Sequence, residues 1–385
     1  MKYVKVEDLG QIVTGNTPPT SDMSNYGNYM PFIKATDIIL GSSRYTYVTE
    51  QGYSEKSYKK YKANIVPKGS TCIVTIGSIG KKMTQAHTDL FVNQAINAIL
   101  PYKQYDKDYI YYATKYAVLP QLKIYDSGTT SGRENISKSS FSNIRLYVEE
   151  DFSTQQKIAS ILSAYDRLIE NNTHRICLLE QMAENLYKEW FVRFRFPEHE
   201  KVEMVNGLPK GWKVERIKEC VKRLHFGRTY KAKELSQDGE VIVIDQSTSD
   251  FLGFHNNAPD HHATFNSPII LFGDHSCKFC LMTRDFSLGE NIIPFISKDT
   301  KQIDNYYLYF ATHKLIVTEE YKRHWGRLSS MKILIPTINI QQKFNKLIIK
   351  NEKMKKLLFI QNQHLTRQRD LLLPRLMSGK LEVKS

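Results

Sequence analysis

Gly77-Ser78-Ile79-Gly80-Lys81 is the stretch of this 385-residue chain that most resembles a reactive site, because glycines and a lysine at this spacing can cradle a phosphate. A nucleotide-binding P-loop requires a glycine five residues before the Gly-Lys pair, where this chain has Thr75. It also requires Ser or Thr after the lysine, and here Lys82 follows. The pattern therefore predicts a turn at the end of a strand, in contact with a backbone phosphate at most.

Asn16-Thr17-Pro18-Pro19 is close to the Asn-Pro-Pro-aromatic motif with which adenine methyltransferases hold an extruded base. The inserted Thr17, and Thr20 at the position of the aromatic residue, argue against that chemistry. The chain has no convincing glycine-rich loop for S-adenosylmethionine, and no acidic pair followed by Glu-x-Lys as in nucleases. Neither methyl transfer nor DNA cleavage is therefore expected of this chain.

Cys277-Lys278-Phe279-Cys280, with His275 and His261-His262 nearby, could be half of a zinc site. A structural zinc site usually needs a second pair of ligands at recognisable spacing, and the sequence offers none. The five cysteines are scattered and odd in number, which also argues against a disulfide framework. No metal is expected, and no Ser, Cys or His has partners that would make it a catalytic group. The sequence predicts a binding protein.

The chain carries 54 Lys and Arg against 40 Asp and Glu, a formal net charge of +14. Such a charge favours binding to a polyanion, because counterions are released from its phosphates. Ribosomal partners or an acidic membrane surface would suit the same charge. The 23 tyrosines fit either a nucleic-acid surface or an aromatic-rich core. No apolar run approaches the roughly 18 residues of a membrane span, and the first residues lack the apolar core of a signal peptide. We expect a cytoplasmic protein without membrane contact.

Two long helical stretches must position the loops that could contact a ligand. They begin Gln155-Gln156-Lys157-Ile158 and Gln341-Gln342-Lys343-Phe344, and apolar residues then recur every seven positions, as in a coiled coil. The predicted seam residues are Ile158, Ile161, Tyr165, Leu168, Asn172, Leu179, Met182 and Leu186 in the first stretch and Phe344, Leu347, Asn351, Met354, Leu358, Leu365 and Leu372 in the second. We expect the two stretches to pair with each other. The alternative is two unrelated amphipathic helices on separate cores.

The segments before the two stretches also repeat. Lys213-Val214-Glu215 echoes Lys5-Val6-Glu7, and Tyr306 to Thr312 echoes Asp108 to Thr114. We expect an α+β fold with a pseudo-two-fold internal repeat: two mixed α/β domains separated by two long antiparallel helices that form a coiled coil. The predicted limits are 1–150 for the first domain, 151–200 for the central helix, 201–337 for the second domain and 338–385 for the C-terminal helix.

This order of domain and Gln-Gln-Lys helix, twice, resembles the specificity (S) subunits of Type I restriction-modification systems. The most telling stretches are 186–192 and 371–381, and 5–19 is similar to the opening of the family. The resemblance covers essentially the whole chain. Phe226-Gly227-Arg228-Thr229-Tyr230 departs from the family's Gly-x-Thr-Pro-Pro turn, so the conformation of that loop is not implied.

The resemblance implies that each domain is a target recognition domain that reads one half of a split sequence in double-stranded DNA. The helices would set the unread spacer and dock two methylation (M) subunits, which bind S-adenosylmethionine and methylate adenine N6. Restriction (R) subunits would add translocation and cleavage with ATP and Mg. The S subunit itself would bind no cofactor or metal and catalyse nothing.

Reading bases requires side chains in the major groove, while Lys and Arg on phosphates set the register. Glycine-containing loops with polar and basic neighbours suit this task, since glycine lets the backbone approach DNA closely. The candidate DNA contacts are Thr14, Gly15, Asn16, Thr17, Lys34, Gly77, Ser78, Lys81, Lys82, Thr129, Thr130, Ser131 and Arg133 in the first domain and Arg228, Tyr230, Lys231, Asp274, His275, Lys278, Arg284, Arg323, His324 and Arg327 in the second.

Two other functions compete with this one. A basic coiled-coil scaffold for protein or RNA assembly would show no preference for a bipartite DNA sequence. A self-sufficient modification enzyme would transfer a methyl group unaided, but the motifs for methyl donor and extruded base are missing.

Overall fold

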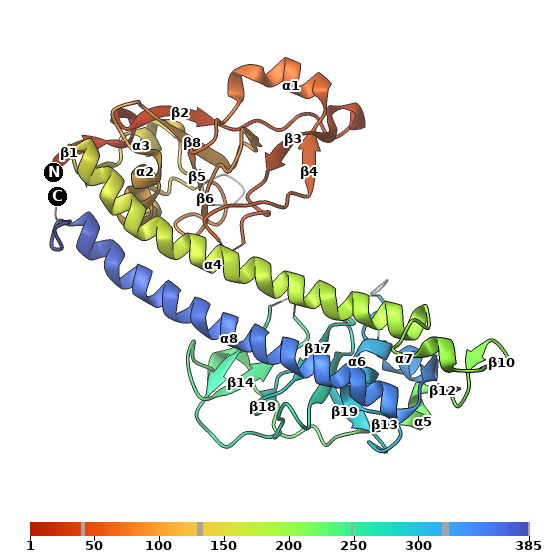
Figure 1. Ribbon diagram of the computed structural model, residues 1–385. Coiled ribbons are helices and arrows are strands. Elements are labelled where there is room, and N and C mark those ends of the chain that lie inside the picture. Colours follow the sequence, from red (N-terminus) through yellow and green to blue (C-terminus); the bar gives the residue numbers. More distant parts are fainter. Residues whose placement is uncertain (40–42, 129–133, 248, 318–322, 384–385) are drawn as a thin grey trace. The chain divides into compact units, whose positions relative to one another are not determined.

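The computed structural model describes residues 1–39, 43–128, 134–247, 249–317 and 323–383 (Figure 1). Contacts divide the chain into two compact units: unit 1 is Met1–His174 with Phe359–Ser385, and unit 2 is Arg175–Leu358. Two long helices, α4 (Phe152–Tyr187) and α8 (Ile338–Met377), contribute one half each to both units. We call the elements before α4 domain 1 and those between α4 and α8 domain 2. No helix in these ranges combines the length and apolarity that crossing a bilayer requires.

Domain 1 is built on two small β-sheets and a two-stranded ribbon. Neighbouring strands are antiparallel, except that β3 and β7 are parallel. The four-stranded sheet has the order β2 (Gly10–Thr14), β8 (Ile96–Pro101), β5 (Thr71–Val74), β6 (Met83–Gln85); the other sheet has the order β4 (Gln51–Tyr53), β3 (Tyr26–Ile33), β7 (Phe91–Val92); and the ribbon pairs β1 (Lys2–Lys5) with β9 (Arg145–Val148). The helices are α1 (Glu55–Tyr61), α2 (Lys107–Ala113) and α3 (Lys138–Ser142).

Domain 2 repeats this topology strand for strand, including a parallel pair, here β14 with β18. Its sheets have the orders β13 (Val221–Arg223), β19 (Ile292–Ser297), β16 (Ile269–Gly273), β17 (Phe279–Met282) and β15 (Gly253–His255), β14 (Val241–Ile244), β18 (Phe286–Leu288); the ribbon pairs β12 (Lys213–Arg216) with β20 (Lys332–Ile335). The hairpin β10 (Met204–Val205) with β11 (Leu208–Pro209) and the helices α5 (Ile217–Cys220), α6 (Asn305–Thr312) and α7 (Trp325–Ser330) complete the domain. The expected internal repeat and mixed fold are confirmed.

Shorter helical segments connect these elements. They are the 3-10 segments Val6–Asp8, Met23–Asn25, Lys62–Asn64, Leu119–Tyr125, His199–Lys201 and Ala232–Glu234, and the π-helical turns Thr114–Val118 and Lys188–Val192, which continue α2 and α4.

The glutamines that open the two long helices make equivalent contacts. Gln155 is fully buried, and its Oε1 accepts a hydrogen bond from the backbone N–H of Asp106 at 2.8 Å. Gln341 accepts one from the N–H of Asp304, also at 2.8 Å. Asp106 and Asp304 are the N-cap residues of α2 and α6. Each glutamine therefore fastens a long helix to the first turn of the tyrosine-rich helix of its domain, which accounts for the first residue of each Gln-Gln-Lys.

Tyrosines lie both in the core and on the surface. The fully buried tyrosines are Tyr53, Tyr109, Tyr112, Tyr306 and Tyr307, whereas Tyr3, Tyr29, Tyr47, Tyr102, Tyr116 and Tyr147 are exposed. An aromatic core and an aromatic surface therefore coexist.

The long helices pair in an antiparallel sense within each unit. In unit 1, Asn172 Nδ2 donates hydrogen bonds to Gln361 Oε1 at 3.1 Å and Asn362 Oδ1 at 3.0 Å. In unit 2, Lys355 Nζ lies 3.0 Å from Glu180 Oε1. Residue numbers thus fall along α8 as they rise along α4. The helices begin at Phe152 and Ile338, beside the predicted starts, while the predicted domain limits stay a prediction.

The seam differs from the predicted one at alternate positions. The heptad positions that include Ile158, Asn172, Phe344 and Leu358 do face inward. Their predicted companions Ile161, Leu168, Met182, Leu347 and Met354 are exposed instead. Residues one position later are buried: Leu162, Ala183 and Ile348. The difference arises from contacts with the domains. Leu162 packs into the core of domain 1 and Ile348 into that of domain 2, so the buried side of each helix faces the domain as well as the partner helix.

Candidate nucleic-acid interface

One side of the turn between β5 and β6 packs against the protein, and the other side is open to solvent. Gly77 N–H donates to the carbonyl oxygen of Glu134 at 2.9 Å, and Ile79 is fully buried. Gly77 has φ +88°, and a Cβ there would meet nothing within 4 Å. Lys81 is exposed and makes no side-chain hydrogen bond or ion pair with any residue that the structure describes. The turn thus presents backbone and one cation to solvent, as a phosphate contact requires.

Lys81→Ala is expected to weaken DNA binding about threefold to tenfold, uniformly over DNA sequences, and to reduce the salt dependence by about one phosphate contact. Fluorescence anisotropy with duplex DNA at several salt concentrations would measure both. Lys103→Ala, which removes the same charge on the turn after β8, is the control. Equal losses for the two variants would mean that only net charge matters.

Several other side chains that were predicted to contact DNA are paired with groups of the protein itself. Lys34 Nζ pairs with Glu50, and Lys82 Nζ donates to the Ala35 carbonyl oxygen at 3.1 Å. In domain 2, Arg284 Nη2 donates to the Glu240 carbonyl oxygen at 3.0 Å, and Lys278 Nζ donates to those of Asp245 and Ser249. These cations hold loops together, so their role as phosphate contacts stays a prediction.

The opening loop 14–17 is tied to the sheet. Thr14 Oγ1 donates to Asn97 Oδ1 at 2.6 Å, and Thr17 Oγ1 donates to Gln94 Oε1. The Asn16 carbonyl oxygen accepts the hydroxyl of Tyr53 at 2.6 Å. A Cβ on Gly15 would lie 2.1 Å from the Val92 carbonyl oxygen, so glycine is required here by the neighbouring strand. The predicted contacts Thr129, Thr130, Ser131 and Arg133 lie outside the described residues.

In domain 2 the structure brings two predicted segments together. The Asp274 carboxylate accepts hydrogen bonds from the backbone N–H groups of His324 and Trp325 at 3.1 and 2.9 Å, and the exposed Arg323 lies 3.9 Å away. His324 is fully buried, whereas Arg327 projects from α7 and is exposed. Asp274 therefore anchors the start of α7, and the exposed arginines of this segment are the better candidates for DNA.

The loop 226–231, whose sequence differs from the family's Gly-x-Thr-Pro-Pro turn, is held in place by charged residues. Arg228 Nη2 lies 2.9 Å from Glu234 Oε1, and its guanidinium lies over the Tyr230 ring at 4.8 Å. Tyr230 is buried and stacks on His255 with ring centroids 4.3 Å apart. The backbone N–H of Lys231 donates to Glu234 Oε2 at 2.9 Å. Tyr230 is thus a core residue rather than an exposed reader.

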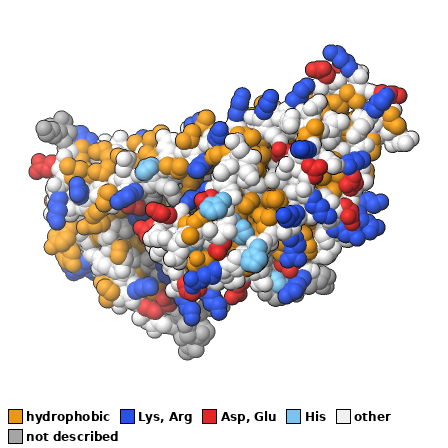
Figure 2. All heavy atoms as spheres, turned by 90° about the horizontal axis from the view of Figure 1, so that it is seen from below, with side chains coloured by type: hydrophobic (Ala, Val, Ile, Leu, Met, Phe, Trp, Pro, Cys, Tyr) orange, Lys and Arg blue, Asp and Glu red, His pale blue; other side chains and the backbone are white. Residues whose placement is uncertain are grey.

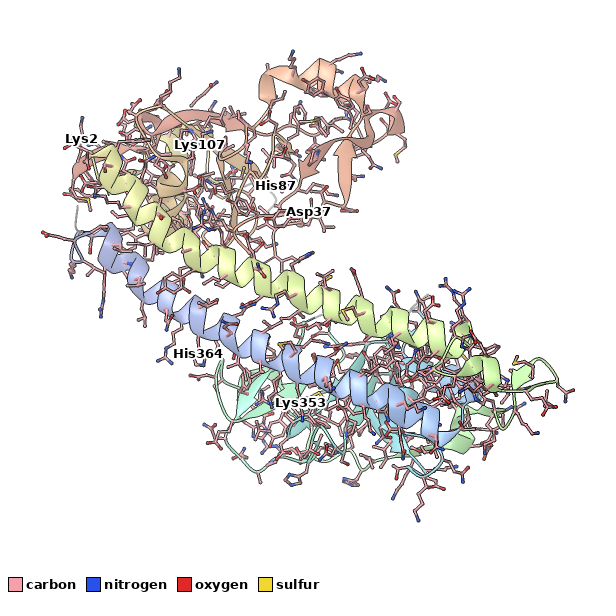
Figure 3. All side chains as sticks on the ribbon, viewed as in Figure 1. Lys2, Asp37, His87, Lys107, Lys353 and His364 are labelled. Carbon is pink, nitrogen blue, oxygen red and sulfur yellow. The ribbon has the colours of Figure 1, made fainter. Side chains whose placement is uncertain are left out.

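Two groups of basic residues were not among the predicted DNA contacts. Helix α1 interleaves Lys56, Lys59 and Lys60 with tyrosines, and Lys60 Nζ lies 5.3 Å from the ring centroid of Tyr61. The first half of α8 carries a run of exposed lysines: Lys343, Lys346, Lys350, Lys353 and Lys356, with Lys353 labelled in Figure 3. Lysines and arginines are spread over the face seen in Figure 2, beside fewer acidic groups. The spacing of the lysines in α8 is visible in the sequence, but these lysines lie on the stretch that the heptad pattern assigns to the coiled coil.

Within the described ranges, no group of three or more His, Cys, Asp or Glu could hold a metal ion. Cys277 has φ +55° in a turn, and burial raises the pKa of the Cys280 thiol.

Glu170 on α4 has a shifted pKa. Burial raises it from 4.5 to about 7, and Asp166 adds to the rise, while Arg44 and a hydrogen bond from Tyr47 oppose it. The unfolded chain loses this proton near the ordinary value, before the folded protein does. Stability is therefore lost as pH rises from about 4.5 to 7.

Glu170→Gln is expected to raise the free energy of unfolding at pH 8 by roughly 1 to 2 kcal/mol, after allowance for solvent screening, and to change little at pH 4.5. Urea unfolding at the two pH values would measure this difference. Glu150→Gln, at an exposed carboxylate, should give no such dependence; a pH-independent effect of Glu170→Gln would contradict the assignment.

A family model and two curated proteins match the chain, one of these proteins over nearly its whole length and the other over less than half. The family model of the Type I restriction modification DNA specificity domain matches residues 1–181 and 209–363. The specificity subunit of the Type I restriction enzyme MjaIX of Methanocaldococcus jannaschii is 28% identical over 426 residues, 99% of this chain and 93% of that protein. The HindI specificity subunit of Haemophilus influenzae is 30% identical over 184 residues, 46% of this chain and 38% of that protein.

A solved structure shows the same fold. The crystal structure of a Type I restriction-modification system S subunit from M. genitalium aligns with a TM-score of 0.58 at 16% identity, over 98% of this chain and 96% of that chain.

Proposed function

Because the chain belongs to the Type I restriction modification DNA specificity family, we propose that it is the subunit that selects the DNA sequence for such a complex. Each domain reads one half of a bipartite target in double-stranded DNA. The observation that carries this proposal is the repeat of the two sheets and the ribbon of domain 1 in domain 2, since the family model also matches the chain in two parts. Specificity subunits of Type I systems are generally non-catalytic. S-adenosylmethionine would belong to the methylation subunits, and ATP and Mg to the restriction subunits.

The test is co-expression with the cognate methylation subunit, followed by mapping of N6-methyladenine in the host DNA. A bipartite motif with a fixed unread gap is expected. Methylation without a split motif would contradict two-domain reading, and DNA binding without sequence preference would favour the scaffold. Methyl transfer by the purified chain alone would contradict the non-catalytic role.

The long helices also supply docking surfaces. Ile161 and Leu168 on α4 are 36% and 51% exposed, and Leu347 and Met354 at the equivalent positions of α8 are 40% and 41% exposed. Each pair is spaced by seven residues, so it forms a stripe that another helix can cover. Equivalent stripes in both units suit two copies of one partner, and we assign them to the two methylation subunits.

Ile161→Glu is expected to weaken binding of the methylation subunit at least tenfold, because it places a charge in an apolar contact. It should change the free energy of unfolding by less than about 1 kcal/mol, since the residue is exposed in the free protein. Calorimetric titration with the methylation subunit would measure the affinity. Gln156→Glu adds the same charge on another exposed side of α4; an equal loss with that control would show a general charge effect.

A further inference from the structure

Domain 1 meets the helix pair through a buried network of charged and polar groups. Arg44 and Asp166 are each 4% exposed, and the Arg369 side chain is 12% exposed. Arg44 Nη1 donates to Ser163 Oγ at 2.8 Å, and Arg44 Nη2 pairs with Asp108. Four segments thus converge here: the loop before β4, and helices α2, α4 and α8.

Asp166 is the centre of this network. One carboxylate oxygen, Oδ1, accepts a hydrogen bond from Arg369 Nη1 at 2.6 Å. The other, Oδ2, accepts one from the hydroxyl of Tyr112, which is itself 3.4 Å from Arg44 Nη1. The carboxylate of α4 therefore links domain 1 through Tyr112 and α8 through Arg369.

The two arginines of the network stay ionised although they are buried. Burial alone would lower the pKa of Arg44, but Tyr112 and Asp108 outweigh it and raise that pKa. Asp166 and Asp370 likewise outweigh burial and raise the pKa of Arg369. Charged hydrogen bonds of a planar guanidinium hold only within a narrow range of directions. A rotation of domain 1 on the helices would break several of them together.

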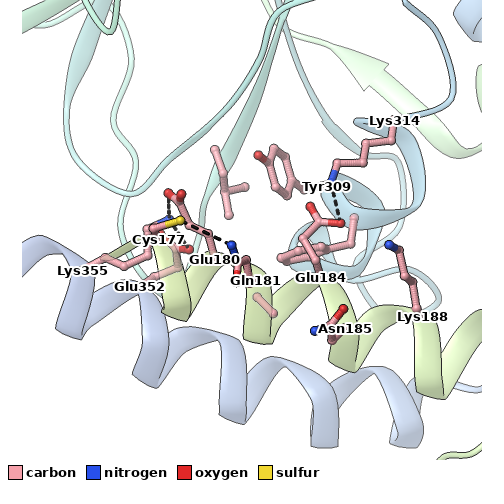
Figure 4. Close-up of a pocket in the computed structure, with 13 residues that line it drawn as sticks. Cys177, Glu180, Gln181, Glu184, Asn185, Lys188, Tyr309, Lys314, Glu352 and Lys355 are labelled. Atoms are coloured by element: carbon pink, nitrogen blue, oxygen red, sulfur yellow. Dashed lines mark hydrogen bonds and ion pairs between the residues drawn. The ribbon is translucent and has the colours of Figure 1, made fainter. Parts of the chain in front are cut away.

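Among the residues that the structure describes, unit 2 has no arginine-centred network of this kind. Phe310 stands where domain 1 has Tyr112, Glu352 stands at the position of Asp166, and Ala183 stands at that of Arg369. The corresponding region, between α4, α6 and α8, is a cavity of about 710 Å³ (Figure 4). Glu184 pairs there with His313 and with the exposed Lys314. Domain 2 therefore meets its helices around a cavity lined by partly exposed ion pairs, which include Lys355 with Glu180 and Glu352, whereas more deeply buried charges lock domain 1.

We propose that Arg44, Asp166 and Arg369 are positioning residues that fix the angle of domain 1 on the helix pair and make the complex strict about spacer length. This inference rests on the proposed function. One added base pair moves a half-site by about 3.4 Å and turns it by about 35° around the DNA axis. Domain 1 must rotate to follow that shift, and the network resists the rotation.

The test uses the complex with its methylation subunits and a panel of DNA targets whose two half-sites are separated by the native spacer or by one base pair more or less. For Arg369→Gln, the ratio of methylation at altered to native spacers is expected to rise at least tenfold. Arg369→Lys keeps the charge but not the planar guanidinium, so it should recover only part of the native ratio. The cost of a mismatch within either half-site should not change. Glu184→Gln, at the hollow joint of unit 2, is the matched control and should leave the ratio as in the native protein.

Asp166→Asn, which keeps the shape of the side chain, provides a second route if Arg369→Gln does not fold. An unchanged spacer ratio in a folded variant of either kind would overturn the inference. A loss of half-site discrimination together with spacer discrimination would also overturn it, because the variant would then have damaged reading rather than position. Absence of any spacer preference in the native complex would instead contradict the proposed function.

Discussion

Asp166→Ala is expected to lower the free energy of unfolding by about 3 to 5 kcal/mol, the usual result of removing one partner from a buried ion pair. The loss is large because the Arg369 guanidinium and the Tyr112 hydroxyl stay largely buried after their acceptor on α4 is gone. Urea unfolding followed by circular dichroism would measure it.

Asp370→Ala is the matched control for this experiment. Asp370 also pairs with Arg369, at 2.8 Å, but its side chain is 51% exposed. Solvent screens that pair, so the loss should stay below about 1 kcal/mol. Similar losses for Asp166→Ala and Asp370→Ala would show that burial does not govern this network.

Lengthening both long helices by four residues is expected to change the DNA spacer that the complex accepts. The insertions would lie between Asn172 and Glu180 in α4 and between Lys355 and Gln361 in α8, so that the antiparallel pairing within each unit is kept. Four helical residues add about 6 Å. This length corresponds to nearly two base pairs at about 3.4 Å each. Methylation at the native spacer should fall at least a hundredfold, with gain at a spacer about two base pairs longer.

A four-residue insertion at Gly207, in the hairpin between β10 and β11, is the control for added length. Gly207 is exposed, and a Cβ there would meet nothing within 4 Å, so the fold should accept it. That variant should keep the native spacer. Retention of the native spacer by the helix variant would contradict the role of the helices as the ruler.

The repeat, the long helices and their pairing followed from the sequence, because they depend on local and periodic information. Heptad spacing requires only that a helix bury one stripe, and Gln155 and Gln341 mark two starts in one pattern. The resemblance to specificity subunits depended on these same features. The basic charge indicated a polyanion, but could not say which lysines face solvent.

Three-dimensional packing decided the rest. The companion seam lies one residue later than predicted, since the domains compete with the partner helix for the face of α4 and α8. Lys34, Lys82 and Lys278 are paired with groups distant in sequence, whereas Lys81, next to Lys82, is exposed. No spacing could reveal this, because a lysine in a loop looks the same whether its partner is a carbonyl or water.

The network around Asp166 is the clearest case. Its members come from residues 44, 108, 112, 163, 166 and 369, and none of them follows a local pattern. The sequence by itself determined that the chain has two domains, each next to a pair of long helices. Only the tertiary structure decided that charged groups are deeply buried at one joint and line a cavity at the other, because burial and geometry, not residue type, decide whether a charged side chain holds two elements together.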